Sequence, residues 1–81
     1  MENEGVIECV LSEVHGERRR QDRKWGEQNH TPEGWIPILG EEFGEVCRAV
    51  YEKDAASYRE ELLHVAAVAV AMVECHDRNM K

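Results

Sequence analysis

The chain has 81 residues, of which 42% are hydrophobic and 33% are charged, a composition typical of one small globular domain rather than of a disordered segment. Its formal net charge of −7 argues against a nucleic-acid-binding module, which usually carries a basic face. The longest apolar run, Leu62 to Val73, is too short to cross a bilayer, so we expect neither nucleic acid nor a membrane as a partner.

The chain contains three cysteines, Cys9, Cys47 and Cys75, which are far apart and form no C-x-x-C pair. An odd number of scattered cysteines is typical of reduced thiols packed as small hydrophobic residues in a cytoplasmic protein. No positively charged segment precedes a hydrophobic run near the N-terminus, so we expect no signal peptide.

An amphipathic helix is predicted after a frayed tail over residues 1–5, because five hydrophobic residues recur at helical spacing: Val6, Ile7, Val10, Leu11 and Val14. The same side continues as Arg18, Gln21 and Trp25, so the stripe changes from apolar to polar and basic. Either the helix runs out of the core into a site, or its basic residues complement the helix dipole and cap its last carbonyls. The pattern alone does not separate the two.

The segment from Trp25 to Trp35, W-G-E-Q-N-H-T-P-E-G-W, predicts a loop of about ten residues, because glycine, proline and small polar residues dominate it. Its tryptophans offer faces for stacking on a nucleobase, and Gln28, Asn29 and His30 offer hydrogen bonds. The alternative is that one or both tryptophans cover the end of a helical bundle.

A second helix is predicted from a first turn containing Pro37 to about Lys53, with an apolar stripe formed by Leu39, Phe43, Val46, Cys47 and Val50. The acidic stretch Gly40–Glu45 lies on it, with Glu42 at the border of the stripe. Like charges one turn apart cost about 0.2–0.5 kcal/mol per pair, and a divalent cation would reverse that cost. The alternative is a solvated acidic face in which Arg48 pairs with Glu45.

A third helix is predicted to about Asn79, beginning near a link in which Asp54 or Ser57 is the N-cap. Glu61 and His64 fall on one side of it, although a lone histidine is more often a hydrogen-bonded core residue than a ligand. The rest is rich in alanine and valine, which predicts burial on most sides. A chain of this size has few other elements that could surround such a helix. We therefore expect a homodimer or homotetramer with this helix at the interface.

The order and spacing of these motifs resemble the MazG-like superfamily of all-α nucleoside triphosphate pyrophosphohydrolases, whose pattern is E-E-x-x-E on one helix and E-x-x-D on the next. Glu41-Glu42-Phe43-Gly44-Glu45 matches the first half in full, and Glu61-Leu62-Leu63-His64 matches the second except at its last position. The segment from Trp25 to His30 is similar to the W-x-x-Q-x-H loop of such proteins. The resemblance covers roughly residues 17 to 74, and its basic and alanine-rich runs look like those of small phage and bacterial members.

The resemblance implies an all-α fold of three helices that assembles with partner subunits into a helical bundle. It also implies a hydrolase that splits a nucleoside or deoxynucleoside triphosphate into the monophosphate and pyrophosphate, with Mg²⁺ as cofactor and Mn²⁺ as the alternative ion. Its implied metal ligands are Glu42, Glu45, Glu61 and His64. Its implied catalytic residues are Glu41, which is either a further ligand or the base that positions water, and Glu45. Its implied substrate-binding residues are Arg18, Arg23, Lys24, Trp25, Gln28 and His30.

His64 departs from the family pattern, because an imidazole supplies a neutral nitrogen where the family has a carboxylate oxygen. Mg²⁺ prefers oxygen, whereas a nitrogen ligand suits Mn²⁺ or another transition ion. Three interpretations follow: His64 is a ligand, it hydrogen-bonds a group behind the ligands, or the site has lost its activity. The last gives the rival hypothesis of a catalytically silent helical module that binds a nucleotide or a protein partner. We expect His64 to face the site, because Glu61 is its neighbour one turn away.

Overall fold

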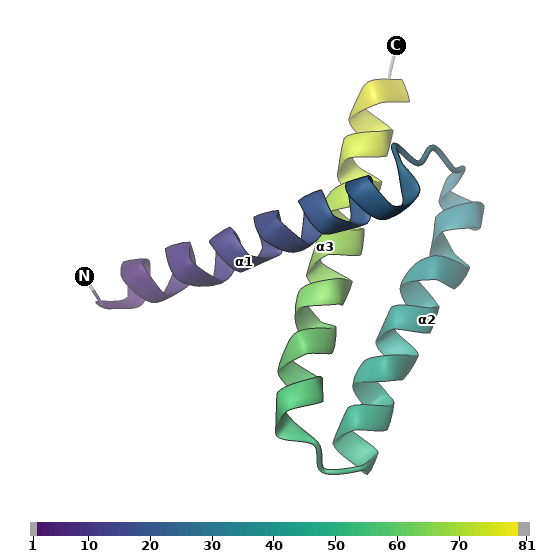
Figure 1. Cartoon of the computed structure of the whole chain (residues 1–81). Coiled ribbons are helices and arrows are strands. Elements are labelled where there is room, and N and C mark those ends of the chain that lie inside the picture. Colours follow the sequence, from purple (N-terminus) through teal and green to yellow (C-terminus); the bar gives the residue numbers. More distant parts are fainter. Residues whose placement is uncertain (1, 80–81) are drawn as a thin grey trace.

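The computed structural model describes residues 2–79, which form three α-helices: α1 (Glu2–Trp25), α2 (Pro32–Tyr51) and α3 (Ala55–Asn79) (Figure 1). No strand occurs in this range, which confirms the all-α prediction. Helices α2 and α3 form an antiparallel hairpin, and α1 crosses and packs against α3. None of the described helices is both long and apolar enough to span a membrane.

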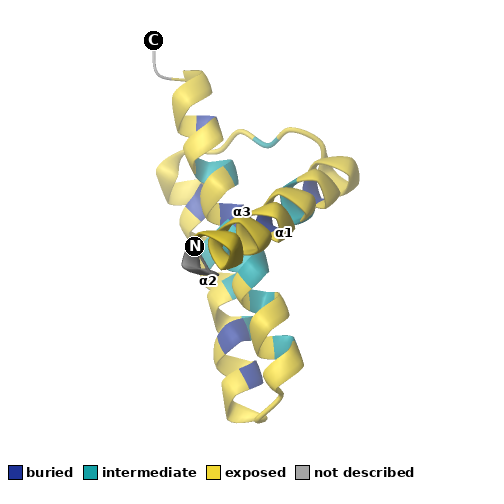
Figure 2. Ribbon diagram, turned by 90° about the vertical axis from the view of Figure 1, so that its left-hand side faces the viewer, coloured by how far each residue is buried: buried dark blue, intermediate teal, exposed yellow. Residues whose placement is uncertain are grey.

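Helix α1 is held by its C-terminal half, while its N-terminal half extends away from the hairpin (Figure 1). The helix begins at Glu2, so residues 2–5 are helical rather than the frayed tail expected from sequence, and Met1 lies outside the described residues. Val14 and Gln21 are buried, whereas the other members of the predicted stripe are 37–62% exposed: Val6, Ile7, Val10 and Leu11. The helical spacing was therefore predicted correctly, but four of the five apolar residues of the stripe are exposed. The N-terminal half of α1 accordingly has the colour of exposed residues in Figure 2.

Helix α2 begins earlier than the sequence-based expectation. Thr31 is its N-cap, with Oγ1 accepting a hydrogen bond from the Gly34 amide at 3.1 Å, and Pro32 occupies the first turn. A proline at that position is favourable, because it has no amide hydrogen to leave unpaired and its φ suits a helix. The connection is therefore residues 26–31, shorter than the expected ten. Pro37 lies inside the helix, so its assignment to the first turn was wrong.

The turn between α2 and α3 is fixed by backbone hydrogen bonds. Lys53 adopts a left-handed conformation with φ of 57°, its amide donates to the Val50 carbonyl, and the amide of Asp54 donates to that of Ala49. These bonds satisfy carbonyls that the end of a helix leaves unpaired. Asp54 then caps α3, accepting from the Ser57 amide at 3.1 Å, which decides between the two predicted caps. Both ends of α3 fall where the sequence predicted them.

The hairpin core is formed by Trp35, Val68 and Cys75, with Ile38, Leu39, Ala71 and Met72 packed against it. Farther along, Val46, Ala49 and Ala67 are buried. The predicted stripe of α2 is correct for Leu39 and Val46, which are packed. It is wrong for its other three members, because Phe43, Cys47 and Val50 are exposed, whereas Glu42 lies on the half-buried side.

Helix α3 is also less buried within the chain than its composition predicted. Tyr58, Leu62, Val70 and Val73 are exposed, whereas one side of the helix packs against α2 and α1. All three cysteines are free thiols, but only Cys75 is packed as expected, since Cys9 and Cys47 are exposed.

Candidate functional site

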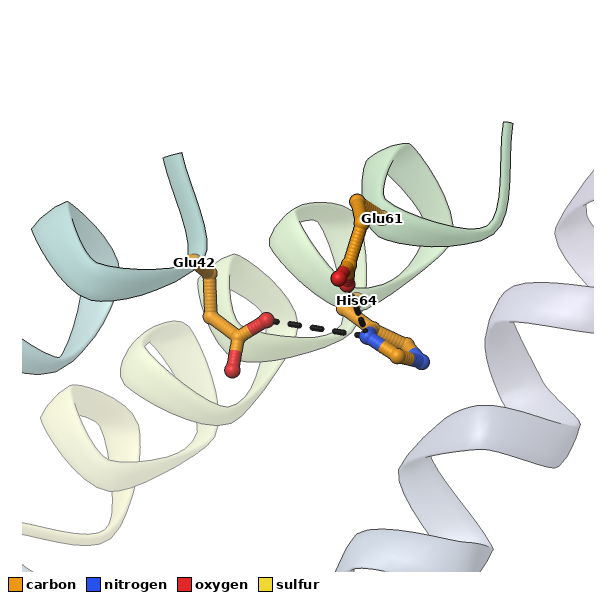
Figure 3. Close-up of side chains that lie close together, drawn as sticks. All are labelled: Glu42, Glu61 and His64. Carbon is orange, nitrogen blue, oxygen red and sulfur yellow. Dashed lines mark hydrogen bonds and ion pairs between the residues drawn. The ribbon is translucent and has the colours of Figure 1, made fainter. Parts of the chain in front are cut away.

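Glu42 of α2 and Glu61 and His64 of α3 form one cluster between the two helices (Figure 3). One ligand atom from each side chain lies within 4.8 Å of the other two. His64 Nδ1 lies 2.5 Å from Glu61 Oε1 and 3.6 Å from Glu42 Oε2, and the three side chains are 20–24% exposed. The structure thus brings together three of the four metal ligands predicted from sequence, and His64 faces them.

The packing of the hairpin explains this convergence. Glu42 lies two turns after the buried Trp35 on α2, and His64 lies one turn before the buried Val68 on α3. Because residues three and four apart share a helix face, the same contacts that bury Trp35 and Val68 turn Glu42 and His64 toward each other. Glu61 precedes His64 by one turn and shares its side.

The cluster is electrostatically unfavourable for the ionised form of Glu42. Burial raises the pKa of Glu42 above its usual range, the carboxylates of Glu61, Glu41 and Glu45 raise it further, and His64 opposes them. A divalent cation in contact with these oxygens would remove that penalty, because it compensates both the desolvation and the repulsion. Two carboxylates and an imidazole are a donor set that fits such an ion.

Glu17 of α1 lies on the other side of His64. Its Oε2 is 3.7 Å from His64 Nε2, and its side chain is only 12% exposed. Arg20 donates two hydrogen bonds to it, at 2.8 and 2.7 Å, and Gln21 donates one at 3.2 Å. The hydrogen bonds from Arg20 are the main reason that the pKa of Glu17 lies below its usual range. Sequence analysis missed Glu17, although its position one turn after Val14 and next to the buried side of α1 was a usable signal.

A cavity of about 460 Å³ adjoins the cluster, bounded by the C-terminal half of α1, the loop that follows it, and α2 and α3. Glu42 lines it, so one side of the cluster faces the cavity. A volume of this size suits a small organic ligand such as a nucleotide. Charged side chains supply much of the lining: Arg18, Asp22, Glu27, Glu41, Glu42, Glu74 and Arg78.

Three of the six predicted substrate-binding residues line this cavity, namely Arg18, Trp25 and Gln28. Arg18 is already paired, since its Nε donates to Glu74 at 3.0 Å and its guanidinium also donates to Asp22 at 2.9 Å. Trp25 is 52% exposed, whereas Trp35 is 4% exposed in the core. One tryptophan therefore covers the bundle, as the structural alternative held, and the other stays available to a ligand.

The other three predicted substrate-binding residues do not line it. Arg23 borders a separate hollow that reaches His64 from the α1 side, and Lys24 stacks its ammonium 4.8 Å from the centre of the Trp25 ring. His30 packs edge-on against the Trp35 ring at 4.8 Å, on the far side of that indole. The early start of α2 explains the position of His30, because His30 directly precedes the N-cap residue Thr31.

The two predicted catalytic glutamates differ in position. Glu41 is exposed and lines the cavity. Glu45 lies outside the cluster, with its Oε2 3.9 Å from Arg48, which is the ion pair that the solvated-face alternative predicted.

Comparison of the chain with models of protein families, with curated proteins and with solved structures finds no match. The geometry and the motifs are therefore the basis on which a function is proposed.

Proposed function

We propose that the chain is a metal-dependent pyrophosphohydrolase of nucleoside or deoxynucleoside triphosphates and a member of the MazG-like superfamily. The observation that carries this proposal is the cluster of Glu42, Glu61 and His64, whose Glu42 lines a 460 Å³ cavity that also offers an exposed indole. The intact E-E-x-x-E motif supports it. A bare acidic face would leave the cavity, the indole and the histidine without a common explanation.

Each group has a role in that chemistry. Glu42, Glu61 and His64 would hold Mg²⁺ or Mn²⁺, which would neutralise negative charge on the phosphates. Trp25 stacks on the base and Gln28 hydrogen-bonds its edge. Arg78 and Arg18 face the phosphates, and Arg18 exchanges Glu74 for them.

Glu41 is the base, accepting a proton from the water that attacks the α-phosphorus. The bond from that phosphorus to the bridging oxygen breaks, and pyrophosphate leaves. Glu41 is suited to the role because it lies in the cavity without belonging to the cluster that holds the cation.

The test is a panel of nucleoside and deoxynucleoside triphosphates incubated with Mg²⁺ or Mn²⁺, with pyrophosphate release as the readout. Glu61→Gln keeps the shape of the side chain but removes one charge from the cation, so we expect activity to fall by roughly 100-fold or more. Glu60→Gln is the matched control, because it removes the same charge one residue earlier, and we expect its activity to stay within about twofold. Equal activity of both variants would contradict the proposal, and release of orthophosphate alone would indicate a different hydrolase.

The second candidate is a silent module that binds a nucleotide without turnover. It is favoured by His64 in place of a carboxylate and by the separation of Glu45 from the cluster. Binding of a non-hydrolysable triphosphate, followed by calorimetry, distinguishes the two. Tight binding without pyrophosphate release with either ion would support the module.

We also propose that the chain assembles with copies of itself. The N-terminal half of α1 has an exposed apolar stripe, and an isolated helix of that length is marginal in water. The chain itself offers a counterpart, since Phe43, Val50, Tyr51 and Tyr58 are exposed on α2 and α3. Exposed Glu4 and Glu8 flank the stripe, and exposed Lys53 and Arg48, the latter paired with Glu45 and Glu52, flank the counterpart.

Sedimentation tests this assembly. We expect a dimer or tetramer at micromolar concentration, and a shift toward monomer for Leu11→Glu, which places a charge within the stripe. Ser12→Glu adds the same charge at the next exposed position and is expected to leave the assembly intact. A stably folded wild-type monomer under these conditions would contradict the proposal.

A further inference from the structure

We propose that Glu17 positions His64 as a metal ligand, and that the resulting site selects a transition ion such as Mn²⁺ or Co²⁺ over Mg²⁺. This inference rests on the proposed metal centre but not on the reaction proposed for it. It adds a residue of α1 to a site whose ligands all belong to the α2–α3 hairpin.

The two nitrogens of His64 face different groups. Nδ1 lies 2.5 Å from Glu61 and 3.6 Å from Glu42, whereas Nε2 lies 3.7 Å from Glu17. A neutral imidazole carries its hydrogen on one nitrogen and its lone pair on the other. In the structure the 2.5 Å contact is a hydrogen bond, and because an ionised carboxylate only accepts, Nδ1 donates it to Glu61. A cation bound between these side chains would replace that hydrogen at Nδ1, and the carboxylate of Glu17 would then favour the hydrogen on Nε2. A histidine ligand is commonly oriented in this way by a carboxylate beyond it.

The position of Glu17 is set from α1 rather than from the hairpin. Arg20 and Gln21, on the same helix, hold both of its carboxylate oxygens with hydrogen bonds of 2.7–3.2 Å. The 3.7 Å gap to Nε2 exceeds a hydrogen bond by roughly 0.5 Å, a distance that a small rotation of the imidazole closes. Glu17 is thus a pre-arranged acceptor, and binding of an ion at Nδ1 is expected to shorten the contact.

The donor set determines the class of ion. Mg²⁺ takes oxygen ligands almost exclusively, whereas an imidazole nitrogen favours Mn²⁺, Co²⁺, Ni²⁺ or Zn²⁺, in the order set by their affinity for nitrogen. In this cluster, one of the three donors is nitrogen. A carboxylate behind that histidine makes the nitrogen a better donor still. Selectivity for a transition ion should therefore depend on Glu17, while affinity for Mg²⁺ should depend on it little.

The experiment measures binding of Mg²⁺, Mn²⁺ and Co²⁺ alone to the whole protein by calorimetry, without nucleotide. We expect Co²⁺ and Mn²⁺ to bind at least about tenfold more tightly than Mg²⁺. Glu17→Gln should weaken Co²⁺ binding by about 10- to 100-fold and Mg²⁺ binding far less, and Glu17→Asp should restore part of the loss. His64→Asp should reduce the preference for Co²⁺.

Glu13→Gln is the matched control. Glu13 lies one turn before Glu17 on α1, and its carboxylate joins α1 to Arg59 of α3 but does not contact His64.

A spectroscopic readout accompanies the affinities. Nitrogen chemical shifts of His64 in the Zn²⁺ complex should show the hydrogen on Nε2, and Glu17→Gln should weaken that preference.

Two results would overturn the inference. If Glu13→Gln and Glu17→Gln weaken Co²⁺ binding equally, Glu17 acts only by docking α1. If Mg²⁺ binds as tightly as Co²⁺ does, the site is not selective for a transition ion. Failure of the proposed function gives a different result, because tight and Glu17-dependent Co²⁺ binding would persist without hydrolysis of any triphosphate.

Discussion

The α2–α3 hairpin and helix α1 are held in place by different forces. The hairpin is packed around Trp35, Val68 and Cys75, and it carries all three side chains of the candidate metal cluster. Helix α1 buries Val14 and Gln21 but is otherwise attached to α3 through polar side chains, in the pairs Glu13–Arg59 and Arg18–Glu74. The structure therefore places the candidate metal ligands on a packed scaffold, and places Glu17, which we propose to position His64, on a more weakly held helix.

This difference has a physical consequence for local stability. Exposed ion pairs contribute little net free energy, because solvent screens them and the side chains lose freedom. Buried aromatic and aliphatic groups contribute several kcal/mol each. We therefore expect α1 to open from α3 more often than the hairpin opens, so that the cavity and Glu17 are dynamic while the cluster of Glu42, Glu61 and His64 persists.

The largest expected effect is a loss of stability of the hairpin. Trp35→Ala should lower the free energy of unfolding by about 3–5 kcal/mol, because it empties the centre of a small core. A chain of this size has little more stability than that to lose, so thermal melting followed by circular dichroism should lose its cooperative transition.

Trp25→Ala is the matched variant, since the same residue type is half exposed at the cavity. It should change the free energy of unfolding by less than about 0.5 kcal/mol while weakening nucleotide binding. Equal destabilisation by the two substitutions would contradict the assignment of one tryptophan to the core and the other to the ligand.

A smaller effect separates α1 from the hairpin. Arg18→Ala removes a side chain that is only 11% exposed and that joins α1 to Glu74, so we expect a loss of about 1 kcal/mol. Hydrogen exchange should speed up in α1 while the protection of α2 and α3 stays unchanged. Arg19→Ala is the control, because Arg19 is exposed and bonds only to His15 of its own helix. Faster exchange throughout the chain would show that α1 and the hairpin unfold as one unit.

The smallest effect concerns the turn of the hairpin and its dependence on pH. Hydrogen bonds from the Ser57 amide and hydroxyl lower the pKa of Asp54 below its ordinary value of 3.8. Since the folded-state pKa is depressed, the stabilisation is present above pH 3.8 and is lost as the pH falls through the folded-state value. Asp54→Ala should lower the melting temperature by a few degrees at pH 7 and by less near pH 3.

Asp54→Asn separates the contribution of the charge of Asp54 from that of its role as a cap. Asparagine also caps a helix but does not titrate in this range, so its melting temperature relative to wild type should rise as the pH is lowered. A constant difference between wild type and Asp54→Asn from pH 7 to pH 3 would show that the charge of Asp54 contributes nothing to the turn.

Helix content and the ends of α3 could be predicted because they depend on neighbouring residues. Asp54 was one of two candidate caps, and Thr31 and Pro32 form a local helix-start signal within the segment that was predicted as loop. The pairing of Glu61 with His64 also follows from spacing along one helix. These features are local, and the sequence contains what fixes them.

The direction in which each helix faces depends on its partner, and this is where sequence reasoning failed. Phe43 and Val50 are as apolar as the residues that α2 buries, so periodicity alone could not show that Glu42 rather than Glu45 lies nearer to α3. The approach of Glu17 to His64 joins distant parts of the chain, so the local spacing after Val14 could place Glu17 beside the buried side of α1 but could not show that it meets His64.

The tight turn through Lys53 and Asp54 also has a consequence for the order of folding. It brings α2 and α3 together through contacts that are close in sequence, whereas α1 reaches α3 through pairs such as Glu13–Arg59, 46 residues apart. Closing the shorter loop costs less chain entropy, and contacts of low sequence separation form fastest. The hairpin should therefore form first and present α3 as a template, with α1 docking last and completing the surroundings of His64 only at the end of folding.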